Sequence, residues 1–322
     1  MSRAADRYDL IAMGRVGVDL YPLQSGVPLS EVSTFAKSLG GSPTNVAVAA
    51  ARYGHRVALI TKVGNDPFGV YVKGALSDFG VDYQWVSTDP RLRTPIVFCE
   101  LFPPDRFPIL FYREPKAPDM NLEPSDLPDF EIASARIVWT TGTGLADHPS
   151  RGTTMLALEA RSGRAITIHD LDFRPSLWPN PSEAADLGRK ALTHATVAVG
   201  NCEECAVVVG EASPQEQALR MRDQYGLELA IVKLGREGVL AAWGDTWEQL
   251  PPVPVEVVNG LGAGDAFGGA LCHGLLQGWD TIETIRFASA AGAYVAARLA
   301  CADAMPTEEQ VRSLLATKEE VS

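Results

Sequence analysis

The sequence predicts an α/β fold, with a mostly parallel sheet and helices on both of its faces. Apolar runs of strand length alternate with helix-like segments along almost all of the 322 residues, and this alternation is typical of β-α-β units. Most of the apolar runs are continuous, as expected of strands that are covered on both faces. Ligands of such sheets bind at the carboxyl ends of the strands, so polar residues at those ends are candidates for a site.

The strands and the helix starts are predicted from local signals. Ser42-Pro43 combines a capping serine with a proline in the first turn. Ser213 is followed three residues later by Glu216, which makes a capping box, and residues 307–310 repeat this device for the last helix. The apolar runs predict strands at residues 9–13, 57–63, 136–141, 165–170, 196–200 and 229–234.

Two segments, residues 16–37 and 94–113, break this alternation. The second is rich in strand-forming residues on either side of a proline-containing turn at residues 102–106, which predicts a hairpin. A hairpin inserted into an α/β domain needs something to cover. Because no linker or internal repeat is visible, we predict one domain that spans residues 1–322.

The composition excludes several classes of function. A net charge of −12 argues against nucleic acid or an anionic membrane as a partner. No apolar run approaches the length of a membrane span, and the N-terminus has no signal-peptide segment. The five scattered cysteines fit a reducing cytosol, so we expect a cytoplasmic protein. Cys202 and Cys205 have C-x-x-C spacing, but no second pair supports a metal site.

The most informative stretch is residues 259–267, NGLGAGDAF. A helical apolar pattern follows directly, which places Gly262, Ala263 and Gly264 at a helix N-terminus, where unpaired N–H groups and the positive end of the dipole gather. Glycines let those N–H groups close on a phosphate oxygen. Asp265 beside the bound anion makes sense as a base that takes a proton from an attacking hydroxyl. The alternative is a glycine turn followed by an ordinary acid in the first helical turn.

Three motifs together resemble the ribokinase-like (PfkB) carbohydrate kinases. Residues 262–265, Gly-Ala-Gly-Asp, resemble their second signature, and residues 40–45, GGSPTN, resemble their first. Residues 201–204, NCEE, fit their Asn-x-x-Glu. The motifs occur in the family's order, and the resemblance extends from about residue 8 to residue 315.

This resemblance implies a ribokinase-like three-layer fold and an enzyme that transfers phosphate from ATP, with Mg²⁺, to a sugar hydroxyl. Asp265 would be the catalytic base and Gly262 to Gly264 the anion hole. Residues 16–37 and 94–113 would form a small β-sheet lid over the sugar, which is often also a contact of a homodimer. The partners would then be a small sugar and ATP.

The resemblance also assigns the sugar side of the site. Gly40 and Gly41 permit close approach of a sugar, and the amide of Asn45 both donates and accepts hydrogen bonds. Asp19, just after the first strand, accepts from two sugar hydroxyls. The alternatives are a tight turn and a surface acid.

The nucleotide side follows in the same way. Asn201 and Glu204 lie after a strand end, and Glu204 would hold the magnesium–phosphate assembly, through water because Mg²⁺ keeps several waters. Lys233, Gly235 and Gly238 follow another strand and would form the ATP loop. The alternatives are a capping asparagine with an exposed glutamate, and an ordinary turn with a solvated lysine.

Residues 14–20, 112–114, 170–175 and 303–307 resemble the branch of the family that phosphorylates 5-dehydro-2-deoxygluconate in inositol breakdown. Arg113 and Arg174 lie in these segments, and a guanidinium can hold a carboxylate by two parallel hydrogen bonds. We therefore expect a keto-sugar acid as substrate. The alternatives are two surface arginines in salt bridges, a kinase for 2-dehydro-3-deoxygluconate or fructose, and a non-catalytic sugar-binding sensor.

One departure concerns a monovalent cation. The family usually has Asp-Thr where this chain has Asn259 and Gly260, and that aspartate helps bind the cation beside the anion hole. A neutral asparagine weakens the case for potassium, so we expect little dependence on it.

Overall fold

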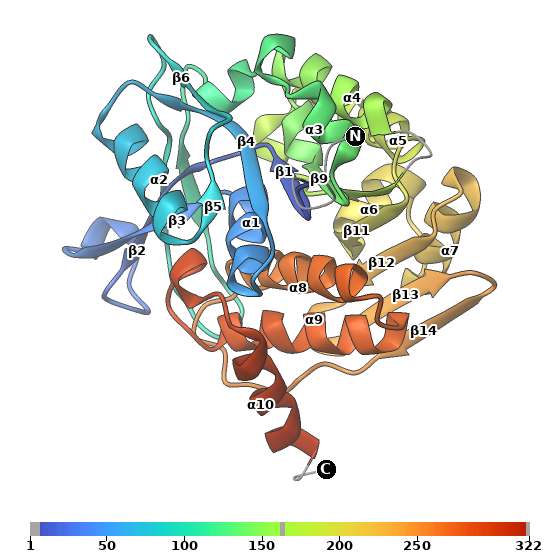
Figure 1. Cartoon of the computed structure of the whole chain (residues 1–322). Coiled ribbons are helices and arrows are strands. Elements are labelled where there is room, and N and C mark those ends of the chain that lie inside the picture. Colours follow the sequence, from blue (N-terminus) through green and yellow to red (C-terminus); the bar gives the residue numbers. More distant parts are fainter. Residues whose placement is uncertain (1–6, 162–164, 320–322) are drawn as a thin grey trace. The chain divides into compact units, whose positions relative to one another are not determined.

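The computed structural model describes residues 7–161 and 165–319 of the chain (Figure 1). Contacts between Cα atoms divide the chain into two compact units. Unit 1 comprises Met1–Gly14 and Met120–Pro252, and unit 2 comprises Arg15–Asp119 and Val253–Ser322. The single domain expected from the sequence stays a prediction.

Unit 1 contains a mixed but mostly parallel sheet with the strand order β14-β13-β12-β11-β10-β9-β1. The pairs from β1 through β9, β10 and β11 to β12 are parallel, while β13 and β14 add an antiparallel hairpin at the edge. The strands predicted for this unit from apolar runs are thereby confirmed. They are β1 (Leu10–Met13), β9 (Ile137–Thr141), β10 (Ile166–Asp170), β11 (Val197–Asn201) and β12 (Leu229–Lys233). The edge strands β13 (Val239–Trp243) and β14 (Thr246–Leu250) were not predicted.

The helices of unit 1 follow one another in space as they do in sequence. α3 packs on α4, α5 packs on α6, and α6 packs on α7, which also covers β12 and β13 (Figure 1). Their apolar faces and the continuous apolar strands form a core around Leu192, Met221 and Ala230. The capping box of Ser213 and Glu216 is present at the start of α7. The helices are α3 (Asp129–Ser134), α4 (Ser150–Arg161), α5 (Pro181–Leu192), α6 (Cys202–Val209) and α7 (Pro214–Tyr225).

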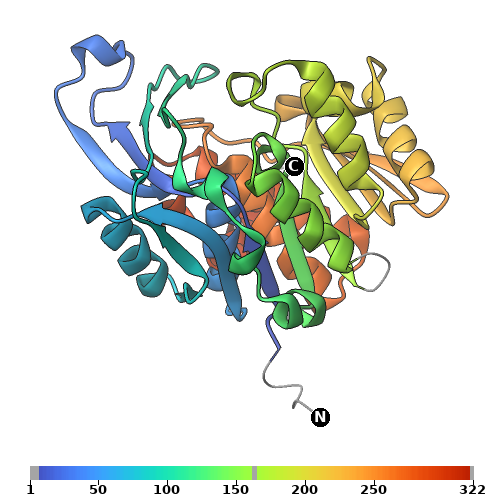
Figure 2. The ribbon, with the colours of Figure 1, turned by 90° about the horizontal axis from the view of Figure 1, so that it is seen from above.

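Unit 2 contains two groups of strands. β4 (Val57–Gly64) pairs in parallel with β5 (Val81–Asp82) and β6 (Val86–Asp89). A separate four-stranded sheet has the order β3-β2-β7-β8 (Figure 2). The two segments that break the α/β alternation supply its strands, which confirms the small second sheet. Its members are β2 (Gly17–Pro22), β3 (Phe35–Gly40), β7 (Ile96–Cys99) and β8 (Ile109–Tyr112).

The helices of unit 2 are arranged around α8, which packs on both α1 and α9 (Figure 1). α8 and α1 approach closely, since a Cβ atom on Gly269 would lie 2.3 Å from that of Ala49. The predicted cap of α1 is wrong by one residue: Gly41 is the N-cap, with φ of 105°, and Ser42 is already helical. The helices are α1 (Ser42–Arg52), α2 (Pro67–Asp78), α8 (Ala263–Gln277), α9 (Thr281–Ala296) and α10 (Glu308–Glu319).

Two further features of the described chain concern membrane-spanning helices and disulfide bonds. Among residues 7–161 and 165–319, no helix is both long and apolar enough to cross a membrane. All five cysteines are free thiols, at positions 99, 202, 205, 272 and 301.

Candidate active site

Asp265 lies in the first turn of α8, as predicted, and Gly262 is the N-cap of that helix. Gly262 has φ of 80°, a left-handed conformation that favours glycine. A Cβ atom there would also lie 2.5 Å from Sγ of Cys301, so no larger residue fits. The first N–H groups of an α-helix lie before the regular intrahelical hydrogen bonds, and at this helix they include those of Ala263 and Gly264. The N-terminus of α8 therefore places backbone N–H donors next to a carboxylate.

Asn45 holds the carboxylate of Asp265 directly. Its Nδ2 atom donates to Oδ2 of Asp265 at 2.8 Å. Asn45 is almost fully buried in α1, and its Oδ1 atom has no hydrogen-bond partner in the described part of unit 2. An unsatisfied buried acceptor is costly, so Oδ1 is well suited to accept a hydrogen bond from a ligand hydroxyl.

Asp19 belongs to the same unit. It is 8% exposed and lies on β2, opposite Ser38 of β3 and Val97 of β7. Burial raises the pKa of its carboxyl to about 7, a hydrogen bond from Tyr21 lowers it, the charge of Asp265 raises it, and Arg15 lowers it. The two carboxylates of Asp19 and Asp265 are therefore within electrostatic reach of each other.

The two glycines of the first motif are required by close contacts. A Cβ atom on Gly40 would lie 2.1 Å from Oδ1 of Asp19. A Cβ atom on Gly41 would lie 2.4 Å from the carbonyl oxygen of Arg15, which also accepts the hydroxyl of Thr44 at 2.9 Å. The glycines thus let the loop before α1 lie against Asp19 and against the start of β2.

Arg113 follows strand β8 and is 9% exposed. Its guanidinium makes a close ion pair with the fully buried Asp119, whose other oxygen accepts the backbone N–H of Val16 at 3.0 Å. The salt-bridge alternative therefore describes Arg113 in this structure, although the partner is buried and not at the surface.

In unit 1, Asn201 and Glu204 form a reciprocal capping box at the start of α6. Glu204 accepts the backbone N–H of Asn201 at 2.8 Å, and Asn201 Oδ1 accepts the backbone N–H of Glu204 at 2.9 Å. Glu204 is 5% exposed, so the alternative of an exposed glutamate is wrong. Lys233 is the register partner of Asn201 on the neighbouring strand. The capping asparagine, the glutamate and the lysine thus gather at the carboxyl ends of β11 and β12.

The turn after β12 uses both predicted glycines. Gly235 has φ of 59° and Gly238 has φ of 93°. A Cβ atom on Gly238 would lie 2.0 Å from the carbonyl oxygen of Leu250, whereas nothing lies within 4 Å of one on Gly235. Of these two glycines, Gly238 is therefore the one that a close contact within unit 1 requires.

Arg174 lies in the loop after β10, with its side chain 41% exposed. Its Nε atom is 3.0 Å from Oδ1 of Asp172, which is buried and has φ of 28°. The hydroxyl of Thr143 donates to the other oxygen of Asp172 at 2.8 Å. The carboxylate of Asp172 thus anchors the arginine from inside unit 1, while Arg113 belongs to unit 2.

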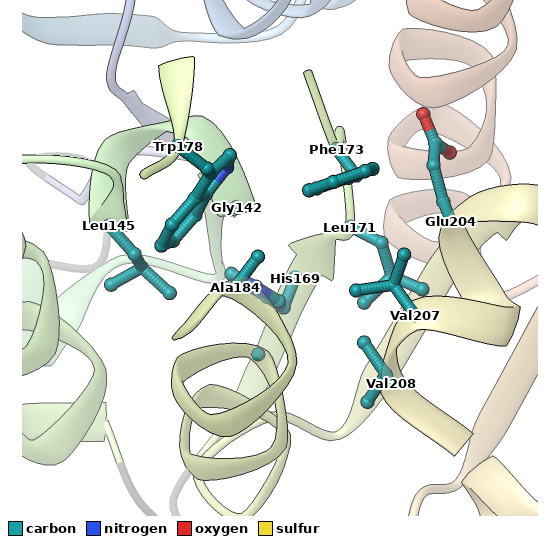
Figure 3. A pocket seen from close by; sticks show the side chains of 11 residues that line it. Gly142, Leu145, His169, Leu171, Phe173, Trp178, Ala184, Glu204, Val207 and Val208 are labelled. Atoms are coloured by element: carbon teal, nitrogen blue, oxygen red, sulfur yellow. The ribbon is translucent and has the colours of Figure 1, made fainter. Parts of the chain in front are cut away.

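A small pocket lies beside this loop in unit 1 (Figure 3). Apolar side chains such as Phe173 and Trp178 line most of it, and Glu204 lies on its wall. His169 also lines it, and burial lowers the pKa of this histidine to about 4. Its ring is therefore neutral near pH 7, with Nδ1 3.0 Å from the hydroxyl of Thr140.

The sequence motifs did not identify every residue around the candidate base. Tyr21, Arg15 and Cys301 all interact with Asp19. For Tyr21 a weak signal existed, because residues two apart on a strand face the same side. Nothing in the sequence indicated Cys301.

The structure offers only a limited donor set for Mg²⁺. In the described part of the chain, no cluster of three or more His, Cys, Asp or Glu side chains can hold a metal ion. Mg²⁺ commonly keeps several waters and is bound through one or two carboxylates plus substrate phosphates. Glu204, buried at the strand ends, fits such a water-mediated role.

Comparisons with known proteins agree over nearly the whole chain. The model of the pfkB family of carbohydrate kinases matches residues 8–308. The 5-dehydro-2-deoxygluconokinase of Clostridium beijerinckii is 32% identical over 323 residues, which cover 98% of this chain and 95% of that protein.

Two solved structures are similar in fold. A fructokinase from Xylella fastidiosa with bound ATP superposes with a TM-score of 0.84 and 26% identity, covering 96% of this chain and 98% of that one. A fructokinase from Vibrio cholerae O395, with fructose, ADP and a calcium ion bound, superposes with a TM-score of 0.84 and 29% identity, covering 95% and 98%.

Proposed function

Because this chain belongs to the pfkB family of carbohydrate kinases, we propose that it transfers the γ-phosphate of ATP to the terminal hydroxyl of 5-dehydro-2-deoxy-D-gluconate. The relative from Clostridium beijerinckii bears the name of this activity, and the similarity extends over 98% of the present chain. The observation that carries the proposal is the bond from Asn45 to Asp265 at the N-terminus of α8. A positioned carboxylate beside the backbone donors of a helix N-terminus suits phosphoryl transfer to an alcohol.

In the proposed reaction, Asp265 takes the proton of the terminal hydroxyl as that oxygen attacks the γ-phosphorus. Asn45 holds the carboxylate of Asp265 through Oδ2 and so orients the base for this transfer. The backbone N–H groups at Gly262, Ala263 and Gly264 donate to the oxygens of the transferring phosphoryl group. Donors that are already in place stabilise this charge without reorganisation.

Unit 2, which carries Asp265, also supplies the groups that bind the sugar hydroxyls. Asp19 and Oδ1 of Asn45 accept sugar hydroxyls, and Gly40 and Gly41 allow the sugar to approach the backbone. Each unit supplies one arginine as a candidate for the carboxylate of the substrate. Arg174 is half-exposed and oriented by Asp172. Arg113 is fixed by Asp119, a bond made by Nη2, which leaves other guanidinium N–H groups as donors.

The nucleotide is held by residues of unit 1. Asn201 and Glu204 lie at the start of α6, and Lys233, Gly235 and Gly238 lie at and after the end of β12. Glu204 would hold Mg²⁺ through water. When bound, the metal ion neutralises the charge of the phosphates.

The small sheet of unit 2 serves in this proposal as the lid over the sugar and as a contact between two copies of the chain. Leu110 and Tyr112 alternate on strand β8 and are 47% and 60% exposed. Apolar groups on one face of a sheet favour pairing with a second surface. Sedimentation equilibrium of wild type and Tyr112→Glu would show whether the dimer forms and depends on this face.

A second candidate substrate is fructose, since two structural relatives are fructokinases. 2-Dehydro-3-deoxygluconate is a further acid-sugar candidate. A non-catalytic sugar sensor is the alternative from another class. The bond between Asn45 and Asp265 argues against the sensor, because a protein that only binds sugar has no use for an oriented base.

The test is a coupled ADP-release assay over a panel of neutral and acid sugars, with Asp265→Asn as the matched blank. We expect sugar-dependent ADP release, with the highest kcat/KM for 5-dehydro-2-deoxy-D-gluconate. Higher kcat/KM for fructose would establish the second candidate. No sugar-dependent ADP release from any substrate, together with measurable sugar binding, would favour the sensor.

A further inference from the structure

Tyr21 connects the sugar-binding carboxylate to a buried thiol. Its hydroxyl lies 3.2 Å from Oδ2 of Asp19 and 2.7 Å from Sγ of Cys301, a residue 280 positions away in the sequence. Tyr21 is fully buried, Cys301 is 2% exposed and Asp19 is 8% exposed. Water therefore has little access to these three groups, so their hydrogen bonds are made mainly with one another.

The direction of the two hydrogen bonds follows from which groups carry protons. Burial raises the pKa of the Tyr21 hydroxyl and of the Cys301 thiol well above their ordinary values, so both remain protonated near neutral pH. An ionised carboxylate can only accept. The Tyr21 hydroxyl then donates to Asp19, and the thiol of Cys301 donates to the oxygen of Tyr21.

The far end of this chain of bonds reaches the helix that carries the candidate base. Gly262, the N-cap of α8, packs so closely on Cys301 that a Cβ atom at Gly262 would lie 2.5 Å from Sγ. Tyr21 thus lies between the carboxylate that meets the sugar and the residue that supports the anion hole. All of these residues belong to unit 2.

We propose that Tyr21 is a positioning residue for sugar binding: its hydroxyl, supported by the thiol of Cys301, orients Asp19 and favours its ionised form near neutral pH. This inference rests on the proposed function in one respect, that Asp19 accepts hydroxyls of the sugar.

The electrostatic surroundings show why Asp19 needs this bond. Burial raises the pKa of its carboxyl to about 7, with the Tyr21 hydrogen bond lowering it, Asp265 on α8 raising it and Arg15 lowering it. Three further groups in the described part of unit 2 feel the charge of Asp19: Tyr71 on α2, Cys99 on β7 and Cys301. Because the pKa of each is raised, all three are protonated and uncharged at pH 7. A hydrogen bond to the charged form lowers a carboxyl pKa, so loss of the Tyr21 hydroxyl would leave Asp19 more protonated near neutral pH.

The test is Tyr21→Phe, which removes the hydroxyl and keeps the packed ring. We expect the acidic limb of kcat/KM for the sugar to move up by about one pH unit. Near pH 6 this corresponds to about a tenfold loss, which appears mainly as a higher KM for the sugar and recovers toward pH 9. Asp19→Asn should have a low kcat/KM for the sugar at every pH. Cys301→Ser keeps a hydrogen-bond donor to Tyr21, whereas Cys301→Ala does not. The acidic limb of kcat/KM should therefore lie closer to that of wild type in Cys301→Ser than in Cys301→Ala.

The matched control is Tyr53→Phe, which removes another buried tyrosine hydroxyl of unit 2, one without a hydrogen-bond partner among the described residues. We expect its limb to coincide with that of wild type. An unchanged limb in Tyr21→Phe, or an equal shift in Tyr53→Phe, would overturn the inference.

A measurement without turnover separates this inference from the proposed function. The NMR titration of the Asp19 ¹³Cγ signal in the sugar-free protein should have a midpoint about one pH unit higher in Tyr21→Phe than in wild type. If that shift occurs and no sugar is phosphorylated, the proposed function fails while the role of Tyr21 on Asp19 stands. If kinase activity is present and the midpoint does not move, the inference about Tyr21 fails alone.

Discussion

Asn45 donates its side-chain amide to the carboxylate of Asp265 at 2.8 Å, across 220 residues of sequence. The bond joins the two glycine-containing motifs: the asparagine ends the first, and the aspartate ends the second. It holds one oxygen of the proposed base and so fixes the orientation of the carboxylate.

Asp265→Asn should abolish most turnover without preventing nucleotide binding. The substitution keeps size and shape but cannot accept the proton. We expect kcat to fall at least a hundredfold, which corresponds to about 2.7 kcal/mol of barrier at about 1.36 kcal/mol per tenfold. ATP affinity, measured by calorimetry on the same variant, should stay near that of wild type. Turnover within a few-fold of wild type would remove Asp265 from the role of base.

Asn45→Ala should lower kcat about ten- to a hundredfold, because the base loses the donor that orients it. The sugar KM should rise as well, since Oδ1 of Asn45 is also lost. The decisive measurement is a double-mutant cycle with Asp265→Asn. If the amide acts through Asp265, the double variant should be little worse in kcat than Asp265→Asn alone. Fully additive losses would contradict that coupling.

The rate should depend little on potassium. The amide of Asn259 is fully buried, donates to the carbonyl oxygen of Leu299 at 2.6 Å and accepts the backbone N–H of Leu261 at 3.0 Å. These two hydrogen bonds of a neutral amide hold the segment before α8 in place, so no charged group is needed there. Replacing K⁺ with tetramethylammonium at equal ionic strength keeps the screening of charges constant. We expect this exchange to change kcat by less than about twofold. A tenfold loss would mean that a cation site persists on other ligands.

Arg174→Ala should lower kcat/KM for a keto-sugar acid by roughly ten- to a thousandfold, the order expected for lost charge-assisted hydrogen bonds. Activity on a neutral ketose should change far less. Arg151→Ala is the matched control, because Arg151 pairs with Glu183 elsewhere in unit 1 at 2.7 Å. Equal losses on acid and neutral sugars would refute the carboxylate role of Arg174.

Arg113→Ala is a less direct version of this test, because it leaves the buried Asp119 without its cation. Removing one partner of a buried pair typically costs about 3–5 kcal/mol of stability. The ratio of kcat/KM for the acid sugar to that for the neutral sugar removes this complication, since the folded fraction cancels. We expect that ratio to fall at least tenfold if the arginine meets the substrate carboxylate.

The local elements of this protein are determined by its sequence alone. Strands β4, β9, β10, β11 and β12 lie within a residue or two of the apolar runs that predict them. The start of α8 at Gly262 and the capping box at Ser213 were likewise evident. These signals are visible because periodicity and capping depend on residues fewer than five positions apart.

Tertiary structure decided how the side chains pair. No local pattern indicates that Asn45 bonds Asp265, that Tyr21 joins Asp19 to Cys301, or that Arg113 is held by Asp119. The same limit applies to the cap of α1: Gly41 is the N-cap, and the backbone of Arg15, distant in sequence, leaves no room for a Cβ atom there. Partners, burial and the resulting pKa of Asp19 depend on which distant segments the fold brings together. They are properties of packing, which a spacing along the chain does not encode.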